Sequence, residues 1–215
     1  MKFDRFISIA DQLAQADLPG PDAQLEFLSK NMRTRLSAMK HDLNPRLSGV
    51  AAMFYPDDDK DASVILIQRQ SYKGVHSGQI AFPGGKYEDE DSSLEYTARR
   101  EAKEEVGVPI EDPEMIIALT EVYIPPSRFL VKPFIFLLHN QPKLVIDERE
   151  VKSMISLKVH DLLNDDNLKL GNVTLEDGKV INTPFFDANG HRVWGATALI
   201  LNEIKLLLQT KNNLK

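Results

Sequence analysis

Three glutamates in one short stretch of the chain have a spacing that suits a divalent metal ion. Glu101, Glu104 and Glu105 stand at positions i, i+3 and i+4, so a helix places all three on one face. Each like-charge pair at this spacing costs roughly 0.2–0.5 kcal/mol. A divalent cation such as Mg²⁺ or Mn²⁺ would relieve that repulsion, because these ions prefer hard oxygen ligands and leave positions for water and substrate phosphates.

Two glycines, Gly84 and Gly85, precede these glutamates in a loop whose backbone can approach a ligand closely. A glycine loop that leads into a helix bearing carboxylates indicates a site for a metal ion and a phosphate. The alternative interpretation is a solvated charged face, on which Arg99, Arg100 and Lys103 balance the glutamates. The residues around this stretch decide between the two interpretations.

The clearest helix that the sequence predicts covers residues 93–106 and carries the three glutamates. Ser92 and Glu95 fit the S-x-x-E capping box at its start, and Gly107 stands where a helix-terminating glycine belongs. The opposite side is apolar at i, i+4 spacing and suits packing on a sheet, through Leu94, Ala98, Ala102 and Val106.

Hydrophobic periodicity and turn signals predict one α+β domain of mixed strands with a helical extension at its N-terminus. Helical spacing over residues 1–40 is broken at 18–21, and a second helix is expected over 22–32. The segment 71–91 is too rich in Gly and Asp for regular structure. The other predicted elements are strands at 48–56, 63–70, 115–124, 129–138 and 151–157, a short helix at 158–163, a hairpin that turns at 176–178 and a closing helix at 195–209. We therefore divide the chain into an extension, 1–42, and a domain, 43–215.

Composition excludes several classes of protein. The chain has 215 residues, with 26 Lys and Arg against 32 Asp and Glu, and it has no cysteine. Disulfide scaffolds, thiol nucleophiles and cysteine-ligated metals are therefore excluded, and a reducing compartment is allowed, so we expect a cytoplasmic protein. No apolar run approaches the roughly 20 residues of a membrane-spanning helix, and the start of the chain is too charged for a secretory signal. A net charge of −6 disfavours non-specific binding to nucleic acid.

Residues 85–108 resemble the Nudix box, the family signature G-x5-E-x7-R-E-U-x-E-E-x-G-U, in which U is apolar. In two respects they depart from it: the acidic residue after the glycine is Asp91 rather than Glu, and one more residue separates it from the arginine. The resemblance implies a Nudix-type α/β/α sandwich built on a mixed β-sheet. The matching residues are Gly85, Arg100, Glu101, Ala102, Glu104, Glu105, Gly107 and Val108.

The longer box with Asp is typical of one Nudix branch, the coenzyme A pyrophosphatases. Residues 77–85, 129–138 and 191–201 also resemble segments of that branch. One position departs from it, since Gly74 stands where the branch carries an Arg, with Lys73 beside it. Lys73 could supply a point charge there, but not a bidentate contact.

This resemblance implies a metal-dependent pyrophosphohydrolase that cleaves the diphosphate of coenzyme A, or of its derivatives, to 3′,5′-ADP and 4′-phosphopantetheine. A second hypothesis keeps the chemistry but changes the substrate to ADP-ribose, a dinucleotide or a nucleoside triphosphate. A third is a Nudix-like nucleotide sensor without hydrolysis, which the presence of all three glutamates disfavours. The expected partners are a small nucleotide substrate and Mg²⁺ or Mn²⁺, with no nucleic acid and no membrane.

The resemblance also assigns roles to individual residues. Glu101, Glu104 and Glu105 are expected to bind the metal together with the backbone carbonyl of Gly85, and one box glutamate, with Glu101 and Glu104 as candidates, also serves as general base. Arg100 is expected to orient a box carboxylate rather than to contact substrate. We expect Asp91 to set the geometry between the loop and the helix.

Other candidates rest on weaker signals. Glu150 is the candidate for a base or metal ligand from a later loop, and the alternative is an exposed turn charge. Trp194 is expected either to stack on adenine or to belong to the core. The N-terminal helices could cover the sheet, form a homodimer contact or shape the substrate mouth, and the sequence leaves these roles open. The candidates for substrate binding are Arg46, Arg69, Lys73, His76 and Gly84.

Overall fold

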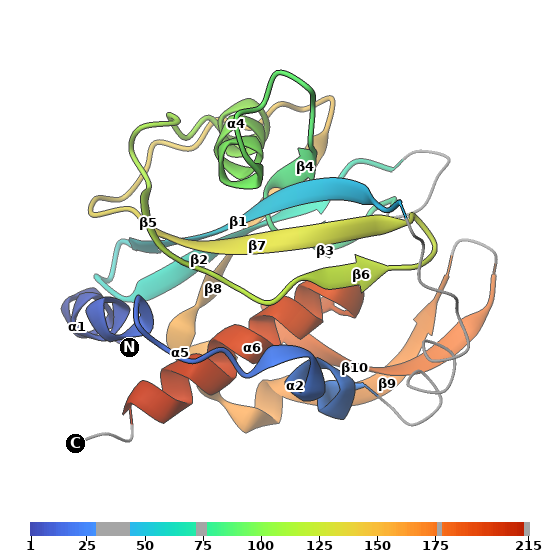
Figure 1. Cartoon of the computed structure of the whole chain (residues 1–215). Coiled ribbons are helices and arrows are strands. Elements are labelled where there is room, and N and C mark those ends of the chain that lie inside the picture. The colour runs from blue at the N-terminus through green and yellow to red at the C-terminus, as the bar shows by residue number, and fades with distance from the viewer. Residues whose placement is uncertain (29–43, 72–76, 176–177, 213–215) are drawn as a thin grey trace.

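The computed structural model describes residues 1–28, 44–71, 77–175 and 178–212. Two substrate-binding candidates, Lys73 and His76, lie outside the described residues. The described part contains a mixed eight-stranded sheet with helices on both faces and a separate three-stranded sheet (Figure 1). The expected α+β sandwich with a mixed sheet is therefore confirmed.

β1 (Arg46–Pro56) is the central strand of the main sheet. On one side it pairs in parallel with β7 (Phe129–Leu137) along most of its length. On the other side its end pairs antiparallel with the start of β2 (Ala62–Arg69), whereas its first half pairs with β4 (Gly84–Lys86). The far end of β2 pairs with β3 (Ile80–Ala81). β1 and β2 therefore diverge, and β3 and β4 fill the space between them.

Three further strands complete the main sheet. β8 (Val151–Lys158) pairs with β2, while β5 (Glu114–Ala118) and β6 (Val122–Ile124) both pair with β7. The single strand predicted over 115–124 is thus wrong, because it is interrupted between β5 and β6. At Thr120 the backbone N–H donates to the side chain of Glu203, 3.2 Å away, instead of to a neighbouring strand.

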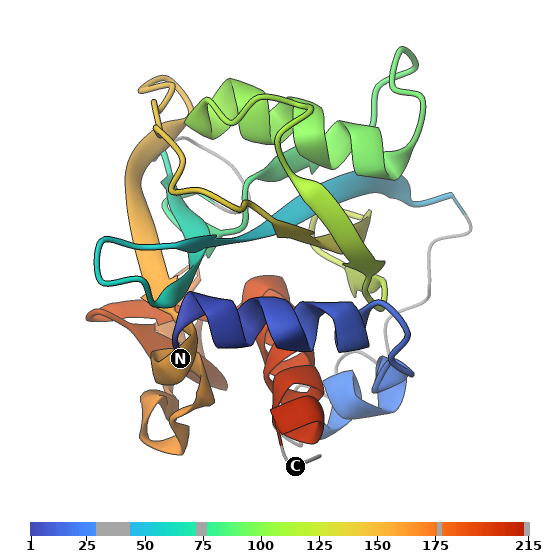
Figure 2. The same cartoon turned by 90° about the vertical axis from the view of Figure 1, so that its left-hand side faces the viewer.

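The alternating side chains of β1 separate two layers of the core. Met53 and Tyr55 pack beneath α4 (Leu94–Val106) on one face, and Ala52 and Phe54 belong to the cluster on the other face. Figure 2 shows α4 above the sheet and the remaining long helices below it. The helices of the lower layer are α1 (Phe3–Leu13), α2 (Gly20–Phe27) and α6 (Gly195–Asn212).

The smaller sheet lies beside α6. It is antiparallel, and β9 (Leu168–Thr174) and β10 (Val180–Ala188) pair as the predicted hairpin requires, while Glu176 and Asp177 of the predicted turn lie outside the described residues. β11 (His191–Val193) adds the third strand and leads directly into α6. The short helices α5 (Val159–Leu163) and η1 (Asp165–Asn167) connect β8 to this sheet.

Two local predictions are wrong, and one is tested only in part. The N-cap of α4 is Ser93, whose hydroxyl accepts from the backbone N–H of Tyr96 at 3.1 Å, and not Ser92 of the predicted capping box. α2 ends at Phe27, and residues 29–32 of the helix predicted over 22–32 lie outside the described residues. The segment 71–91, predicted to be irregular, contains β3 and β4, because their partners lie far away in the sequence and local composition carries no sign of that pairing.

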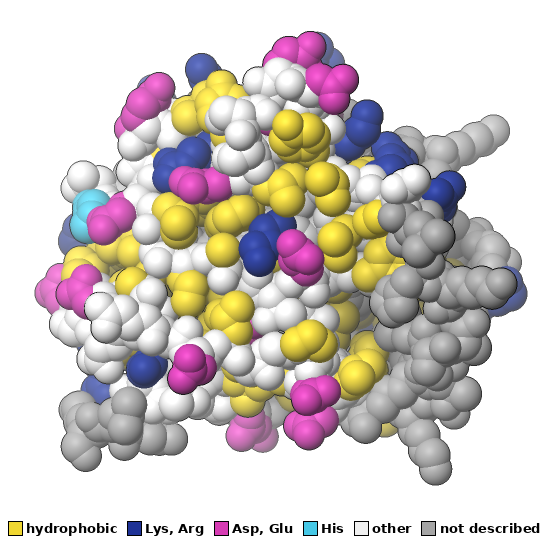
Figure 3. Space-filling model, in the orientation of Figure 1, with side chains coloured by type: hydrophobic (Ala, Val, Ile, Leu, Met, Phe, Trp, Pro, Cys, Tyr) yellow, Lys and Arg dark blue, Asp and Glu magenta, His cyan; other side chains and the backbone are white. Residues whose placement is uncertain are grey.

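The face of the molecule seen in Figure 3 mixes hydrophobic, basic and acidic side chains over the sheet edge and the helices around it. None of the helices within the described ranges is both long and apolar enough to cross a membrane.

Candidate active site

Helix α4 lies unusually close to β1 because Gly49 faces it. A Cβ atom at Gly49 would overlap the carbonyl oxygen of Leu94, in the first turn of the helix. At its other end α4 stops at Gly107, which takes the left-handed conformation with φ of 76° and donates its N–H to the carbonyl of Lys103. Packing on β1 thus sets the distance of α4 from the sheet, and the two caps set where the helix begins and ends.

Glu105 is buried, with 1% of its residue surface exposed, and both of its carboxylate oxygens are bound. Oε2 accepts from the backbone N–H of Gly84 at 2.9 Å, and Oε1 pairs with the guanidinium of Arg69 at 3.1 Å. Burial raises the pKa of Glu105 to about 7, against the lowering effect of Arg69 and Gly84. The negative charges of Glu101 and Glu150 raise this pKa further. The site therefore holds a carboxylate whose charge is only partly compensated.

The glycine loop has no room for side chains. Gly84 has a φ of +152°, and a Cβ there would meet the backbone of Gly49 and Val50. At Gly85, a Cβ would overlap the carboxylate of Glu101. Glycine at both positions lets the loop reach the two glutamates that face it, Glu101 and Glu105.

Arg100 joins the loop to the helix through four partners. Its guanidinium bonds Asp91 at 2.8 and 3.0 Å, Glu101 at 3.0 Å and Glu104 at 3.1 Å. It also donates to the backbone carbonyl of Lys86 at 3.1 Å. These contacts hold the guanidinium of Arg100 against three carboxylates and the loop backbone.

Asp91, the residue that departs from the usual box, anchors the loop ahead of α4. Besides the pair with Arg100, it accepts from the hydroxyl of Thr97 at 2.8 Å and from the backbone N–H of Glu88 at 3.1 Å. The hydrogen bonds from Arg100 lower the pKa of Asp91 to about 2. The shorter side chain of Asp thus meets Arg100, Thr97 and the loop backbone at once.

The box glutamates do not occupy equivalent places. The side chain of Glu101 is 14% exposed, whereas that of Glu104 is 57% exposed and rests on Arg100. Burial raises the pKa of Glu101, and the charges of Glu104 and Glu150 add to that effect. The structure therefore brings Glu101 and Glu105 together at the loop and leaves Glu104 at the rim.

Glu150 directly precedes β8, and its carbonyl accepts a hydrogen bond from the backbone N–H of Gln70 at 2.9 Å. The residue is exposed, and its charge acts on both Glu101 and Glu105. The charge of Glu150 therefore adds to the raised pKa of half-buried Glu101 and of buried Glu105.

The donor chemistry at the loop fits a hard divalent cation. Glu101 and Glu105 offer carboxylate oxygens, and an ionised carboxylate has about four lone-pair sites, so Glu105 keeps acceptor capacity beyond Gly84 and Arg69. Burial and mutual repulsion disfavour their charged forms, and a cation would relieve both effects.

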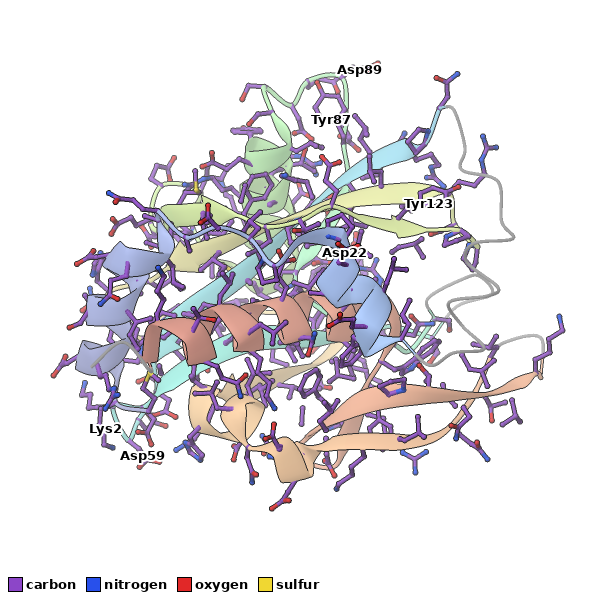
Figure 4. All side chains as sticks on the ribbon, turned by 60° about the horizontal axis from the view of Figure 1, so that its bottom comes forward. Lys2, Asp22, Asp59, Tyr87, Asp89 and Tyr123 are labelled. Carbon is purple, nitrogen blue, oxygen red and sulfur yellow. The ribbon has the colours of Figure 1, made fainter. Side chains whose placement is uncertain are left out.

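A second acidic group lies elsewhere in the molecule. Asp57, Asp59 and Asp61 have carboxylate oxygens within 4.8 Å of one another, the single such group among the described residues. The ammonium of Lys158 lies 2.7–3.3 Å from all three, and Lys2 pairs with Asp61. Figure 4 shows Lys2 and Asp59 together at one corner, far from Tyr87 and Asp89 on the loop ahead of α4. Lysines already compensate this cluster.

The remaining sequence candidates have varied surroundings. Arg69 contacts Glu105, so it belongs to the site as a partner of a glutamate. Arg46 is exposed at the start of β1, with its guanidinium 4.3 Å from the centre of the Phe129 ring. Trp194 is half-buried and lines a cavity. Sequence reasoning missed Gly49, although a glycine inside an apolar strand signals close backbone approach.

A helix that turns one buried and one half-buried glutamate toward a glycine loop, on a mixed sheet between helices, defines a Nudix-type site. The NUDIX domain family matches residues 45–176, which is more than half of the chain. The chain belongs to the Nudix hydrolase family.

Several proteins are similar to this chain. Nudix hydrolase 15, mitochondrial, of Arabidopsis thaliana is 30% identical over 73% of this chain and 56% of its own length. The peroxisomal coenzyme A diphosphatase ndx-8 of Caenorhabditis elegans is 31% identical over 55% of this chain and 51% of its own length. The chain thus spans about half the length of these plant and nematode relatives. Nudix hydrolase NudL of Klebsiella pneumoniae is 29% identical over 84% of this chain and 92% of its own length.

Solved structures support the fold. The Nudix hydrolase RenU of M. smegmatis covers 77% of this chain and 87% of its own, with a TM-score of 0.51 and 18% sequence identity. At that identity the likeness concerns the arrangement of the sheet and helices, which agrees with the sandwich described above.

Proposed function

We propose that this protein is a metal-dependent pyrophosphohydrolase that acts on a nucleoside diphosphate joined to a second group. The observation that carries the proposal is the buried carboxylate of Glu105, held between the N–H of Gly84 and Arg69 and next to Glu101. A divalent ion held there supplies screening of the diphosphate charge and acidification of water.

The chain's own residues prepare that site. Gly84 and Arg69 fix the rotamer of Glu105, and Arg100 fixes Glu101 and Glu104 through its guanidinium. Glu150 is the exposed carboxylate that we assign as proton acceptor from water, because its charge acts on Glu101 and Glu105 and it remains solvated.

The substrate that we propose is coenzyme A or one of its derivatives, cleaved to 3′,5′-ADP and 4′-phosphopantetheine. Support comes from the longer box with Asp91, from the segment 191–201 and from the similarity to the nematode coenzyme A diphosphatase. Gly74, in place of an arginine, is the feature that favours another diphosphate such as ADP-ribose.

Product analysis tests both levels of this proposal. The protein is incubated with Mg²⁺ or Mn²⁺ and, separately, coenzyme A, ADP-ribose, a dinucleotide and a nucleoside triphosphate, and the products are resolved by chromatography. We expect 3′,5′-ADP from coenzyme A well ahead of turnover of the others, and no product with EDTA. Faster turnover of ADP-ribose would replace the coenzyme A assignment. Turnover of none with either metal would leave nucleotide sensing as the function.

A further inference from the structure

A cavity of about 330 Å³ lies between the main sheet and the smaller sheet. Gln68 and Ile80 border it from β2 and β3, and Thr174 and Arg192 border it from β9 and β11. Trp194, at the turn from β11 into α6, completes its wall. In Figure 1 the smaller sheet extends from beneath the main sheet on the side where β9 and β10 are labelled.

The cavity and the glutamates lie at the same end of β2. Arg69 points to the α4 face, where it contacts Glu105, and its neighbour Gln68 lines the cavity. The Cα atoms of neighbouring residues are about 3.8 Å apart, and the pairing of β2 with β8 is irregular between Gln68 and Arg69. One residue step along β2 therefore separates the wall of the cavity from the ion pair at Glu105.

The lining of the cavity is suited to an anionic aromatic ligand. It contains Arg192 and His191 beside the half-buried indole of Trp194, and its described residues include no carboxylate, although the whole chain has a net charge of −6. Arg192 is held in place, because it donates to the carbonyl of Asn172 at 2.9 Å and lies 5.1 Å from the ring centre of Phe185.

We propose that this cavity binds the nucleotide half of the substrate, with the base on Trp194 and a phosphate at Arg192. Indole rings stack on bases of any sequence, and the guanidinium of Arg forms charge-assisted hydrogen bonds to phosphate. The volume is near the lower end of the roughly 300–1,000 Å³ of ligand pockets, which suits one nucleotide rather than a whole dinucleotide-sized substrate. This inference rests on the proposed function, since it assigns one half of that substrate.

The fluorescence of Trp194 tests the inference directly, because it is the single tryptophan of the chain. The full chain is titrated with 3′,5′-ADP and, separately, with 4′-phosphopantetheine, with excitation at wavelengths where adenine does not absorb. We expect a saturable change with 3′,5′-ADP and none with 4′-phosphopantetheine. A flat response to 3′,5′-ADP, in EDTA and in Mg²⁺, would overturn the proposal, as would an equal response to 4′-phosphopantetheine.

Substitution of Arg192 supplies a second readout. Arg192→Gln should weaken 3′,5′-ADP binding and raise KM for the nucleotide substrate about tenfold or more, as the loss of one charged hydrogen bond does. Lys152→Gln is the control for loss of one positive charge, since Lys152 is exposed in β8 and does not line the cavity. Equal effects of the two variants on binding and KM would show that net charge causes the change, and would contradict binding in the cavity.

Two tryptophan variants separate stacking from folding. Trp194→Phe keeps an aromatic ring and should retain binding of 3′,5′-ADP in calorimetry, whereas Trp194→Leu should lose about tenfold or more in affinity. The outcomes also separate the two proposals. Hydrolysis of coenzyme A with an unchanged KM in Arg192→Gln would refute the cavity alone, and a Trp194 response to 3′,5′-ADP without any hydrolysis would refute the enzymatic function alone.

Discussion

Two effects act in opposite directions on the pKa of Glu105, namely burial of its charge and the hydrogen bonds that it accepts. The carboxylate is removed from water, yet Arg69 and the N–H of Gly84 bind its two oxygens. Removing such a group from water raises its pKa, whereas the two partners lower it, and burial prevails. A cation placed beside Glu101 and Glu105 would shift the balance toward the charged form.

We predict that Glu105→Gln leaves the fold intact and lowers turnover by at least about 100-fold, since even residues one step removed from a metal commonly cost 10–100-fold. The amide keeps the shape of the side chain but removes its charge. Steady-state hydrolysis and circular dichroism measure the two effects. Glu111→Gln, at an exposed position just beyond α4, is the control for loss of one negative charge. Turnover equal to that of this control would contradict the role of Glu105.

The raised pKa of Glu105 predicts how stability depends on pH in the metal-free protein. The folded state binds the proton more tightly than the unfolded state, for which the pKa is near 4.5, so stability is greatest below that value and falls as the pH rises toward about 7. The loss amounts to up to about 3 kcal/mol, at about 1.4 kcal/mol per pKa unit.

Thermal unfolding in EDTA at several pH values between these limits measures this loss. Glu105→Gln should flatten the profile, and Mg²⁺ should raise Tm most at the upper end, where the carboxylate is ionised. A wild-type profile as flat as that of Glu105→Gln would show that this carboxyl group is not the cause.

At the scale of elements, the position of α4 depends on a glycine in the neighbouring strand. We predict that Gly49→Ala destabilises the protein by about 3 kcal/mol or more, because the new methyl group would overlap the backbone at Leu94, which cannot move by itself. Activity should fall too, since the glutamates move with the helix.

Gly171→Ala in β9 is the matched control for Gly49→Ala. Its Cβ would lie 2.9 Å from the ring of Phe185, a side chain that can turn away. Chemical denaturation should therefore show a much smaller loss of stability. Equal losses for the two variants would show that close approach of α4 to β1 is not what Gly49 provides.

Elements with strong local signals could be predicted from the sequence, and others could not. α4 was predicted to within one residue because its apolar spacing and Gly107 are local features. The predicted N-cap is one position too early, because serine stands at both 92 and 93 and only the backbone geometry shows which of the two caps the helix. The break near Thr120 was not predicted, since it depends on Glu203, which follows much later in the chain.

At the scale of the whole molecule, the N-terminal helix is part of the main core. Phe6 is fully buried, and its ring stacks on that of Phe54 in β1 with the centres 4.5 Å apart. Phe3 and Leu13 are buried in the same cluster as residues of α6. Of the roles left open by the sequence, α1 therefore covers the sheet.

We predict that Phe6→Ala lowers the free energy of unfolding by about 3–5 kcal/mol, the usual cost of truncating a buried phenylalanine. Asp11→Ala, on the exposed side of the same helix, should have little effect. Denaturant titration of both variants gives the comparison. A small loss for Phe6→Ala would mean that residues 1–13 fold apart from the sheet.

Much of the candidate site could be read from the order of residues, because the Nudix box places Glu101 and Glu105 one helical turn apart. The role of Arg69 could not be read in this way, because Arg69 lies in β2, far from α4 in the sequence, and only the fold brings it to Glu105. The exposure of Glu104 was also not predicted, because spacing puts three glutamates on one face without telling which of them the loop covers.

The parallel pairing of β1 with β7 also sets an order of events in time. Arg46 pairs with Phe129 and Phe54 with Leu137. The central strand β1 therefore cannot complete its pairing until β7, which follows much later in the chain, has been synthesised. Long-range parallel pairing is slow, since loop closure must precede the contacts that reward it. During that interval β1 has only local partners, and its apolar residues are exposed to self-association. Protein yield should therefore depend on the rate and temperature of expression more than the stability of the finished fold suggests.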